Sequence, residues 1–250
     1  ETRGDVLHIQ ALGTITKAEP QVVNLVRSFD SSRFAHALFV QILKDNGITV
    51  NETFARGKTP AGLPELVVHT SDTLAALVKS TNRNSNNFYA ENILKALGAY
   101  LGGEPGTTKK GLNAVYNFLK RAGVNRNTVI LANGSGLFGN SLISPRALCN
   151  AMNQFSTLPW LHTAIMDSLP APGEGTLSKR FASTDAADIL RAKTGTMSSA
   201  SCLAGYLTWK NKTILFAVMQ DNINGDLAGA RTLQDQIVVA LAKYIKNLKP

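Results

Sequence analysis

The chain of 250 residues is 44% hydrophobic and 17% charged, a balance that is typical of a globular protein and excludes a disordered one. Its net charge is +9, but the basic residues are scattered without an arginine-rich tract, so we predict no nucleic-acid partner. No apolar run reaches the roughly 18 residues of a transmembrane helix, so we predict no membrane span.

The first 70 residues predict one helix and three short strands. Asp30 is a typical N-cap for a helix over residues 30–46, and Gly47 is a typical end for it. Short runs with the composition of strands surround this helix. We expect strands over residues 6–15, 49–55 and 66–70.

Four helical segments follow, beginning near Ser71, Asn86, Thr107 and Ser144. The last start is well marked, because Ser144 can cap the first turn and Pro145 suits the first helical position. Between the third and fourth helices, residues 128–131 predict a short strand. Residues 169–175 are rich in glycine and proline and predict a loop.

The C-terminal part predicts three strands, over residues 189–194, 202–209 and 213–220, and then a helix from about Asp226. Connections this short require an antiparallel meander, because parallel strands need long crossovers. The expected fold is therefore an α/β (α+β) sandwich, an antiparallel sheet flanked by helices with an adjoining helical lobe. The last helix carries one apolar stripe: Leu227, Ala230, Leu233, Ile237, Leu241 and Tyr244.

Histidine and cysteine residues give no pattern of a metal site or a disulfide framework. The four histidines are isolated from one another, so we predict no metal and no cofactor. Cys149 and Cys202 each lie in an apolar stretch, which favours a buried free thiol. The first residues contain no apolar segment of a signal peptide.

Two short motifs indicate chemistry, Ser85-Asn86-Asn87 and Lys193-Thr194-Gly195. Each alone is common, and alone each is better explained as a polar turn or the end of a strand. Their order and context are more specific. The first lies between two predicted helices and the second on the first strand of the meander, which is the arrangement expected of penicillin-recognising serine acyltransferases.

Further segments narrow this to one family. Together with the two motifs, the chain from about Phe29 to the last helix resembles the exported D-alanyl-D-alanine carboxypeptidase/endopeptidases grouped with penicillin-binding protein 4. The resemblance implies a β-lactamase/transpeptidase-like fold in which residues 1–250 form most of one catalytic domain. The matching segments are Thr70-Ser-Asp-Thr-Leu74, Ser85 to Glu91, Asn133-Gly-Ser-Gly-Leu137, Ser144-Pro-Arg146, Ser168-Leu-Pro170, Gly175-Thr-Leu177, Lys179-Arg-Phe181, Ala192 to Thr196 and Ala204-Gly-Tyr206.

Two departures from the family stand out. The family usually has aspartate at Asn133 and often Ser-Arg at Phe138-Gly139, so substrate contacts around that loop can differ. No Ser-x-x-Lys, the motif of the nucleophile, occurs in the 250 residues. In the family this motif precedes a long insertion, so we expect Glu1 to lie just after that insertion and the N-terminal segment of the same protein to be a partner.

The resemblance implies the roles of six residues. Ser85 would relay a proton to the leaving nitrogen, Asn87 would bind the substrate peptide, and Lys193 would attract its terminal carboxylate. Thr194 would add a hydroxyl to the same carboxylate. Gly195 would leave room for the substrate as an added strand, and the backbone N–H of Thr196 would be one oxyanion donor. Glu91 and its neighbours Phe88 and Tyr89 are expected only to pack or to cover the helix surface.

The functional prediction is an exported, periplasmic or cell-envelope serine D,D-peptidase. It would act on peptidoglycan stem peptides, as a carboxypeptidase or an endopeptidase, and β-lactam antibiotics would acylate it. Residues 1–250 alone would be inactive. The alternative is an inactive wall-binding or scaffold module that kept the cleft and lost the nucleophile. A β-lactamase would need a deacylating carboxylate that the sequence does not identify.

Two structural expectations follow from the family resemblance. Ser85 Oγ and Lys193 Nζ should lie within hydrogen-bonding reach, with Asn87 pointing into the same cleft. An apolar trough should lie where the helix with the nucleophile would pack, lined by the helices that begin near Ser71 and Asn86 and by the inner face of the sheet.

Overall fold

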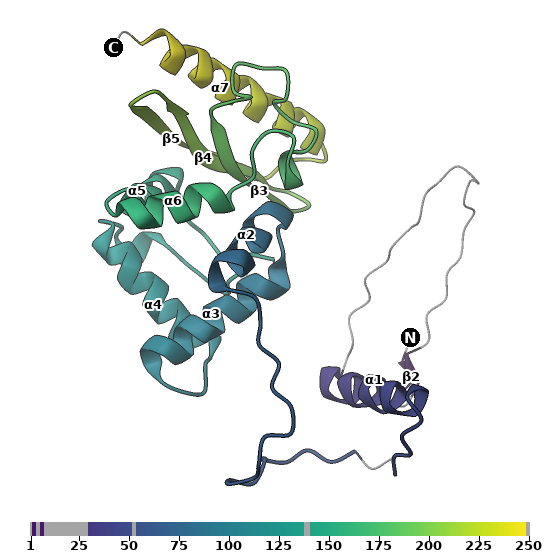
Figure 1. Cartoon of the computed structure of the whole chain (residues 1–250). Helices are drawn as coiled ribbons and strands as arrows, with labels where there is room; N and C mark the ends of the chain where they lie inside the picture. Colours follow the sequence, from purple (N-terminus) through teal and green to yellow (C-terminus); the bar gives the residue numbers. More distant parts are fainter. Residues whose placement is uncertain (1, 4–5, 8–29, 52–53, 138–140, 249–250) are drawn as a thin grey trace, which may run out of the picture. The chain divides into compact units, whose positions relative to one another are not determined.

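The computed structural model describes residues 2–3, 6–7, 30–51, 54–137 and 141–248, which belong to two compact units. The first unit comprises residues 1–68 and the second residues 69–250. Figure 1 shows both units and labels their α-helices and most of their strands. Every residue of the motifs Ser85-Asn86-Asn87 and Lys193-Thr194-Gly195 belongs to the second unit.

The described residues of the first unit form a two-stranded antiparallel pair, β1 (Thr2–Arg3) and β2 (Val6–Leu7), and the helix α1 (Ser31–Asp45). Asp30 caps α1 as predicted, because its side chain accepts from two backbone N–H groups of the first turn. The strand predicted over residues 6–15 begins with β2, and the rest of it lies outside the described residues.

The strands predicted over residues 49–55 and 66–70 are wrong for the residues that the structure describes there. These described residues belong to no helix or strand and form no bridge with another strand. Leu66 and Val67 are almost fully exposed, so nothing packs on their side chains. β-Propensity produces a strand only where a partner and a packing surface exist, and neither is present around these two residues.

The second unit is built on the predicted meander. Strands β3 (Leu190–Thr196), β4 (Ser201–Trp209) and β5 (Lys212–Gln220) form one antiparallel sheet in that order. The pairing places Lys193 opposite Ala204, and Ala204 opposite Ala217. The predicted order, direction and approximate bounds of all three strands are confirmed.

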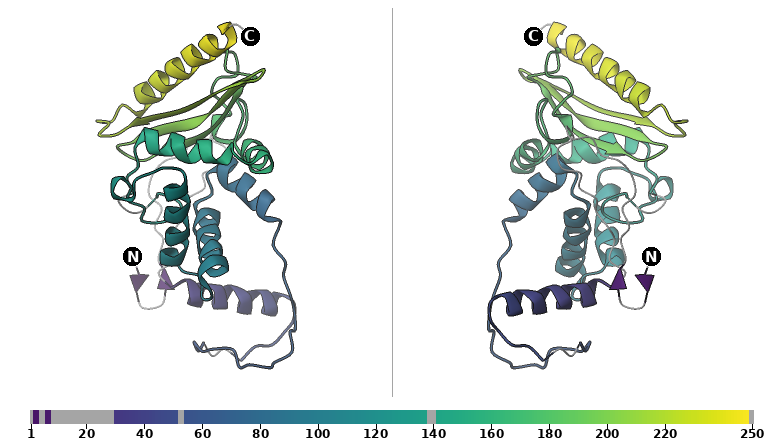
Figure 2. Two further views of the ribbon diagram at one scale, coloured as in Figure 1. Left: turned by 90° about the vertical axis from the view of Figure 1, so that its left-hand side faces the viewer. Right: turned by 90° about the vertical axis from the view of Figure 1, so that its right-hand side faces the viewer.

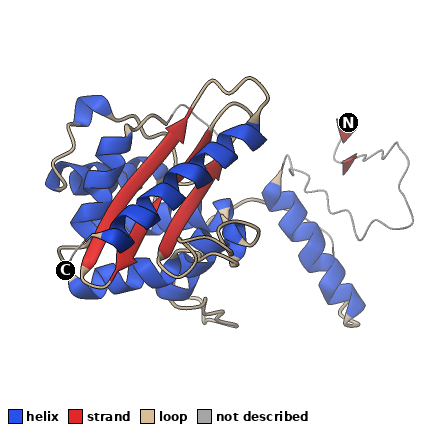
Figure 3. Ribbon diagram, turned by 90° about the horizontal axis from the view of Figure 1, so that it is seen from above, coloured by secondary structure: helices blue, strands red, loops and turns tan. Residues whose placement is uncertain are grey.

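Helix α7 (Leu227–Asn247) covers one face of this sheet (Figure 3). The predicted apolar stripe is only partly right: Ala230 is buried and Leu241 packs against the core, but Leu233 is 49% and Tyr244 60% exposed, whereas Gln234 is completely buried. Gln234 can be buried because its side chain is hydrogen-bonded to Ser201, Gln220 and Arg180. The residues that face the core are Ala230, Gln234, Val238, Ala242 and Ile245.

Two helices, α5 (Pro145–Phe155) and α6 (Pro159–Ser168), lie on the other face of the sheet (Figure 2). The Tyr206 hydroxyl of β4 donates to the backbone oxygen of Met152 at 3.0 Å and ties α5 to the sheet. Helix α6 was not predicted. Its N-cap, Leu158, makes no side-chain hydrogen bond to the first turn, so the usual sequence signal for a helix start is missing.

The helical lobe comprises α2 (Leu74–Asn84), α3 (Asn87–Gly102) and α4 (Thr108–Arg121), close to the predicted helix starts. Helices α3 and α4 pack with their backbones in contact at Gly111. A Cβ atom there would lie 2.2 Å from the backbone oxygen of Leu94, so only glycine permits the approach. The second unit is thus the predicted α/β (α+β) sandwich with an adjoining helical lobe, and the fold class is confirmed.

The short strand predicted over residues 128–131 is wrong. The structure has a single bridge between Ile130 and Leu142 there, preceded by the short helix η1 (Arg126–Thr128). Val129 is buried in a cluster with α4 and α5, so this segment is held by packing rather than by strand pairing. None of the helices in the described part of the chain is both long and apolar enough to cross a lipid bilayer.

Candidate active site

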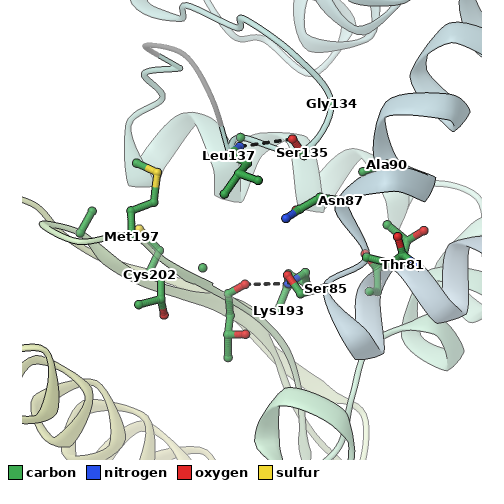
Figure 4. Close-up of a pocket in the computed structure, with 17 residues that line it drawn as sticks. Thr81, Ser85, Asn87, Ala90, Gly134, Ser135, Leu137, Lys193, Met197 and Cys202 are labelled. Carbon is green, nitrogen blue, oxygen red and sulfur yellow. Dashed lines mark hydrogen bonds between the residues drawn. The ribbon is translucent and has the colours of Figure 1, made fainter. Parts of the chain in front are cut away.

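The two predicted motifs meet at one open cleft of about 400 Å³ in the second unit. Three walls surround it: the junction of α2 and α3, the loop of residues 134–137, and strand β3 with the turn that follows it. In Figure 4 Ser85, Asn87 and Lys193 point into the space between these walls. Segments that lie far apart in the sequence therefore contribute to a single site.

Ser85 occupies the corner between α2 and α3. It is the C-cap of α2, with left-handed backbone angles (φ 54°, ψ 47°), and its backbone N–H donates to Thr81. The next residue, Asn86, caps α3 by accepting from the backbone N–H of Tyr89 at 3.1 Å. The sequence Ser-Asn-Asn thus ends one helix and starts the next, which exposes the Ser85 and Asn87 side chains to the cleft.

Lys193 reaches Ser85 from the sheet. Its Nζ donates to Ser85 Oγ at 3.0 Å and to the backbone oxygen of Thr194 at 2.7 Å. Burial of the ammonium group lowers the pKa of Lys193 below its ordinary value of 10.5. The contact predicted between Ser85 and Lys193 is confirmed, and so is the placement of Asn87 in the same cleft.

Strand β3 presents an open edge to the cleft beyond Lys193. Thr194, Gly195 and Thr196 all line the cavity. A Cβ atom added at Gly195 would meet only Cys202, at an ordinary contact distance of 3.6 Å. In the described sheet this stretch pairs with β4 alone, and because its other edge lines the cavity, an extended peptide could be added there.

The loop opposite β3 is held by Glu91, a residue that the sequence-based interpretation assigned only to the helix surface. Glu91 Oε1 accepts from the backbone N–H of Gly134 at 3.1 Å and from the N–H and hydroxyl of Ser135 at 2.9 and 2.6 Å. Burial would raise the pKa of Glu91, but these hydrogen bonds outweigh it and lower the pKa. The sequence does contain a signal for this contact. A carboxylate on the predicted helix and a Gly-Ser-Gly loop with backbone N–H groups to donate could together have suggested it.

Asn133 shapes the turn of the same loop. Its Oδ1 accepts from the backbone N–H of Gly136 at 2.7 Å. Phe138 and Gly139, the other departure from the family pattern, lie outside the described residues. Asn133 therefore stabilises a turn in the wall of the cleft.

The end of the cleft away from Ser85 is apolar. Leu137, Met197 and Cys202 surround it (Figure 4). Cys202 is a free thiol, as is Cys149, in agreement with the prediction of free cysteines, but both side chains are half-buried rather than buried. Burial raises the pKa of the Cys202 thiol, so at neutral pH it behaves as a small apolar side chain.

A second cavity, of about 490 Å³, lies beside the first turns of α2 and α3. Leu74 and Phe88 contribute to its lining and are 64% and 71% exposed. The expectation of an apolar trough against these two helices is thus confirmed. No residue of the sheet lines it, so the expected contribution of the sheet face is wrong.

Comparison with known proteins gives the family of the chain. Over residues 1–244 its sequence matches the D-Ala-D-Ala carboxypeptidase 3 (S13) family. The chain belongs to this family. It is 32% identical over 243 residues to the D-alanyl-D-alanine carboxypeptidase of Actinomadura sp. (strain R39), a match that covers 93% of the chain but only 44% of that protein.

Solved structures agree with this assignment. The crystal structure of penicillin binding protein 4 from Haemophilus influenzae, complexed with a β-lactam, superposes with a TM-score of 0.72 at 25% identity and covers 84% of this chain and 52% of that one. A β-lactamase from Sphaerobacter thermophilus superposes with a TM-score of 0.51 at 19% identity, covering 74% and 68%, and shows a shared fold. The resemblance predicted from the sequence is confirmed.

Proposed function

We propose that the chain is most of the catalytic domain of a serine D,D-peptidase, a D-Ala-D-Ala carboxypeptidase or endopeptidase that cleaves peptidoglycan stem peptides. The observation that carries the proposal is the hydrogen bond from Lys193 Nζ to Ser85 Oγ, because it unites the two motifs of such enzymes in one cleft. Membership of the S13 family supports the same reaction. The proposed reaction uses no metal or cofactor.

Ser85 is the proposed proton relay to the leaving group. Because Lys193 already donates to Ser85 Oγ, the hydroxyl hydrogen of Ser85 is left to point to another acceptor in the cleft. When the tetrahedral intermediate collapses, that hydrogen would pass to the leaving amine nitrogen, and a proton from the lysine side would replace it. Asn87, exposed at the start of α3, would hold the substrate peptide through its amide.

The edge of β3 is the proposed binding surface for the substrate backbone. A peptide laid along Gly195 would meet no side chain of that residue, and its terminal carboxylate would lie near the Lys193 ammonium and the Thr194 hydroxyl. The backbone N–H of Thr196 would then donate to the oxyanion. β-Lactams, which carry a carboxylate beside a reactive amide, would occupy the same surface.

We propose that another stretch of the same protein supplies the nucleophile. The 250 residues contain no Ser-x-x-Lys, and the Actinomadura carboxypeptidase that matches them is more than twice as long as the matched part. The cavity beside α2 and α3, with its exposed Leu74 and Phe88, is the proposed docking place of that N-terminal segment. Such an enzyme would work outside the cytoplasm, in the bacterial periplasm or cell envelope, where peptidoglycan lies.

The absence of Ser-x-x-Lys from the 250 residues also favours a second candidate, an inactive module that binds peptidoglycan. A cleft with Ser85, Asn87 and Lys193 in place could hold a stem peptide without cleaving it. The two candidates differ in covalent chemistry. Only the enzyme forms an acyl bond to a serine.

Labelling with a fluorescent penicillin tests the proposal. We expect no covalent adduct on residues 1–250 alone and one stoichiometric, hydroxylamine-sensitive adduct on the protein as its cell produces it. Peptide mapping should place that adduct on a serine followed three positions later by lysine. If the folded protein from the cell binds stem peptide but is not labelled by penicillin, the proposed enzyme is wrong and the inactive module is the better explanation.

A further inference from the structure

One segment of the second unit, residues 168–175, contacts both walls of the cleft from behind. On the α2 side, Ser168 Oγ accepts from Asn82 Nδ2 at 2.8 Å, and Glu174 Oε2 pairs with Arg83 NH1 at 3.1 Å. On the sheet side, the backbone oxygen of Pro170 accepts from the N–H of Ala192 at 3.2 Å. We call this segment the brace.

The brace is attached next to the two catalytic side chains. Asn82 and Arg83 belong to the last turn of α2, three and two residues before Ser85. Ala192 directly precedes Lys193 in β3. A shift of either attachment would therefore change the distance between Ser85 Oγ and Lys193 Nζ more directly than a shift elsewhere in the unit.

Ser85 needs support of this kind, because its left-handed backbone is unfavourable for a serine. The conformation costs about 1–2 kcal/mol for an L-residue and persists only where the surroundings hold it. Arg83 is the side chain placed to do so. Its NH1 pairs with Glu174 while its NH2 donates to the backbone oxygen of Asp167 at 3.3 Å, so one guanidinium fixes the end of α2 at two points.

The brace is itself well anchored. Leu177, which follows it, is fully buried in the core beneath β3, and Leu169 is buried against Tyr206. Gly175 packs directly on the backbone of Arg83, where a Cβ atom would lie 2.2 Å from the Arg83 oxygen. The Glu174 carboxylate also accepts from the backbone N–H of Ala171 at 3.1 Å, which closes the turn that presents it.

We propose that Arg83 and Glu174 are positioning residues of the reaction: their ion pair, carried by the brace, sets Ser85 against Lys193. This inference rests on the proposed D,D-peptidase function. Neither side chain lines the cleft, so neither touches substrate and both act through Ser85. The predicted consequence is a defect in the rate of acyl transfer with little change in the binding that precedes it.

The test measures acylation of the protein, as its cell produces it, by a fluorescent penicillin over a range of concentrations. Glu174→Gln keeps an oxygen for the Ala171 N–H but removes the charge that pairs with Arg83. Arg83→Lys keeps the charge but cannot reach Glu174 and the Asp167 oxygen together. We expect both variants to lower the limiting acylation rate constant roughly ten- to a hundredfold, with nearly unchanged half-saturating penicillin concentration.

Asp235→Asn is the matched control. Arg180 and Asp235 form an ion pair of similar exposure that joins α7 to the chain after the brace, away from the cleft. This variant should acylate at the wild-type rate even if its melting temperature falls. Crystal structures of Glu174→Gln and the wild type give a second readout, in which the variant should show a longer Ser85–Lys193 distance.

The outcomes separate the two proposals. Wild-type rate constants in both Glu174→Gln and Arg83→Lys would overturn the positioning role and leave the proposed function intact. If a smaller fraction of either variant is labelled but that fraction reacts at the wild-type rate, the ion pair has only a structural role. This result too overturns the inference. If the wild-type protein takes no label, the proposed function fails, and the positioning role fails with it.

Discussion

Lys193 Nζ lies 3.0 Å from Ser85 Oγ although 108 positions of sequence separate the two residues. The contact joins the end of a helix to the first strand of a sheet, and the cleft of the molecule opens where they meet. Burial holds the pKa of Lys193 below its ordinary range, so its proton is easier to give up than that of a surface lysine. The predictions below begin from this pair.

Removing the hydroxyl of Ser85 should impair acylation without unfolding the protein. Ser85→Ala keeps the size of the exposed cap but deletes the proposed proton relay, so we expect a loss of roughly 10²–10⁴-fold in the second-order rate constant for penicillin acylation. Ser156→Ala, at the end of α5, is the control and should react like the wild type. Equal rates in both variants would remove Ser85 from the chemistry.

A side chain at Gly195 should block the substrate and leave the fold in place. The Cβ position has room, with only Cys202 at 3.6 Å, so Gly195→Val should change the melting temperature little. The added methyl groups would occupy the edge of β3 where the peptide is proposed to lie. We expect weaker binding of a D-Ala-D-Ala peptide, measured by calorimetry, whereas binding at wild-type strength would show that the peptide lies elsewhere.

Glu91 should make the stability of the protein depend on acidic pH. Hydrogen bonds from Ser135 and Gly134 outweigh burial and hold the pKa of Glu91 below 4.5 in the folded state. The stabilisation is therefore fully present above pH 4.5 and is lost as the pH falls through the lowered pKa of the folded protein. Glu91→Gln should unfold more easily than the wild type at pH 7, and the difference should shrink below pH 4.5.

Denaturant unfolding at several pH values measures this effect. Glu65→Gln is the control for the loss of one carboxylate, because Glu65 is exposed in the first unit. A Glu91→Gln variant whose deficit in the free energy of unfolding stays constant from pH 7 to pH 3 would contradict the prediction.

The phase of α7 can be tested by two neighbouring substitutions. Gln234→Ala leaves Ser201, Gln220 and Arg180 without a buried partner, and we expect it to lower the free energy of unfolding by about 1–3 kcal/mol. Leu233→Ala, at a half-exposed position, should cost within about 0.5 kcal/mol. Thermal unfolding distinguishes the two. If Leu233→Ala lowered the free energy of unfolding more than Gln234→Ala, the apolar stripe predicted from the sequence would be the face that packs on the core.

Much of this protein could be predicted from local sequence. Asp30, Ser144 and Asp226 cap helices where their side chains can accept from the first turn, and short connections force the three C-terminal strands into an antiparallel meander. These features depend on neighbours in the chain. The Ser-Asn-Asn and Lys-Thr-Gly motifs could be recognised for the same reason, since each is a continuous run of three residues.

Other features depend on contacts between distant residues, and only the tertiary structure decided them. Gln234 faces the core because Ser201 and Gln220 lie there to bind it, which no helical periodicity reveals. Glu91 holds the loop with Ser135 because that loop folds back onto α3. Arg83 is proposed to support Ser85 because the brace brings Glu174 within reach of it. The role of a polar side chain depends on the partner that folding places beside it. The sequence shows the side chain but not which distant residue will be its partner.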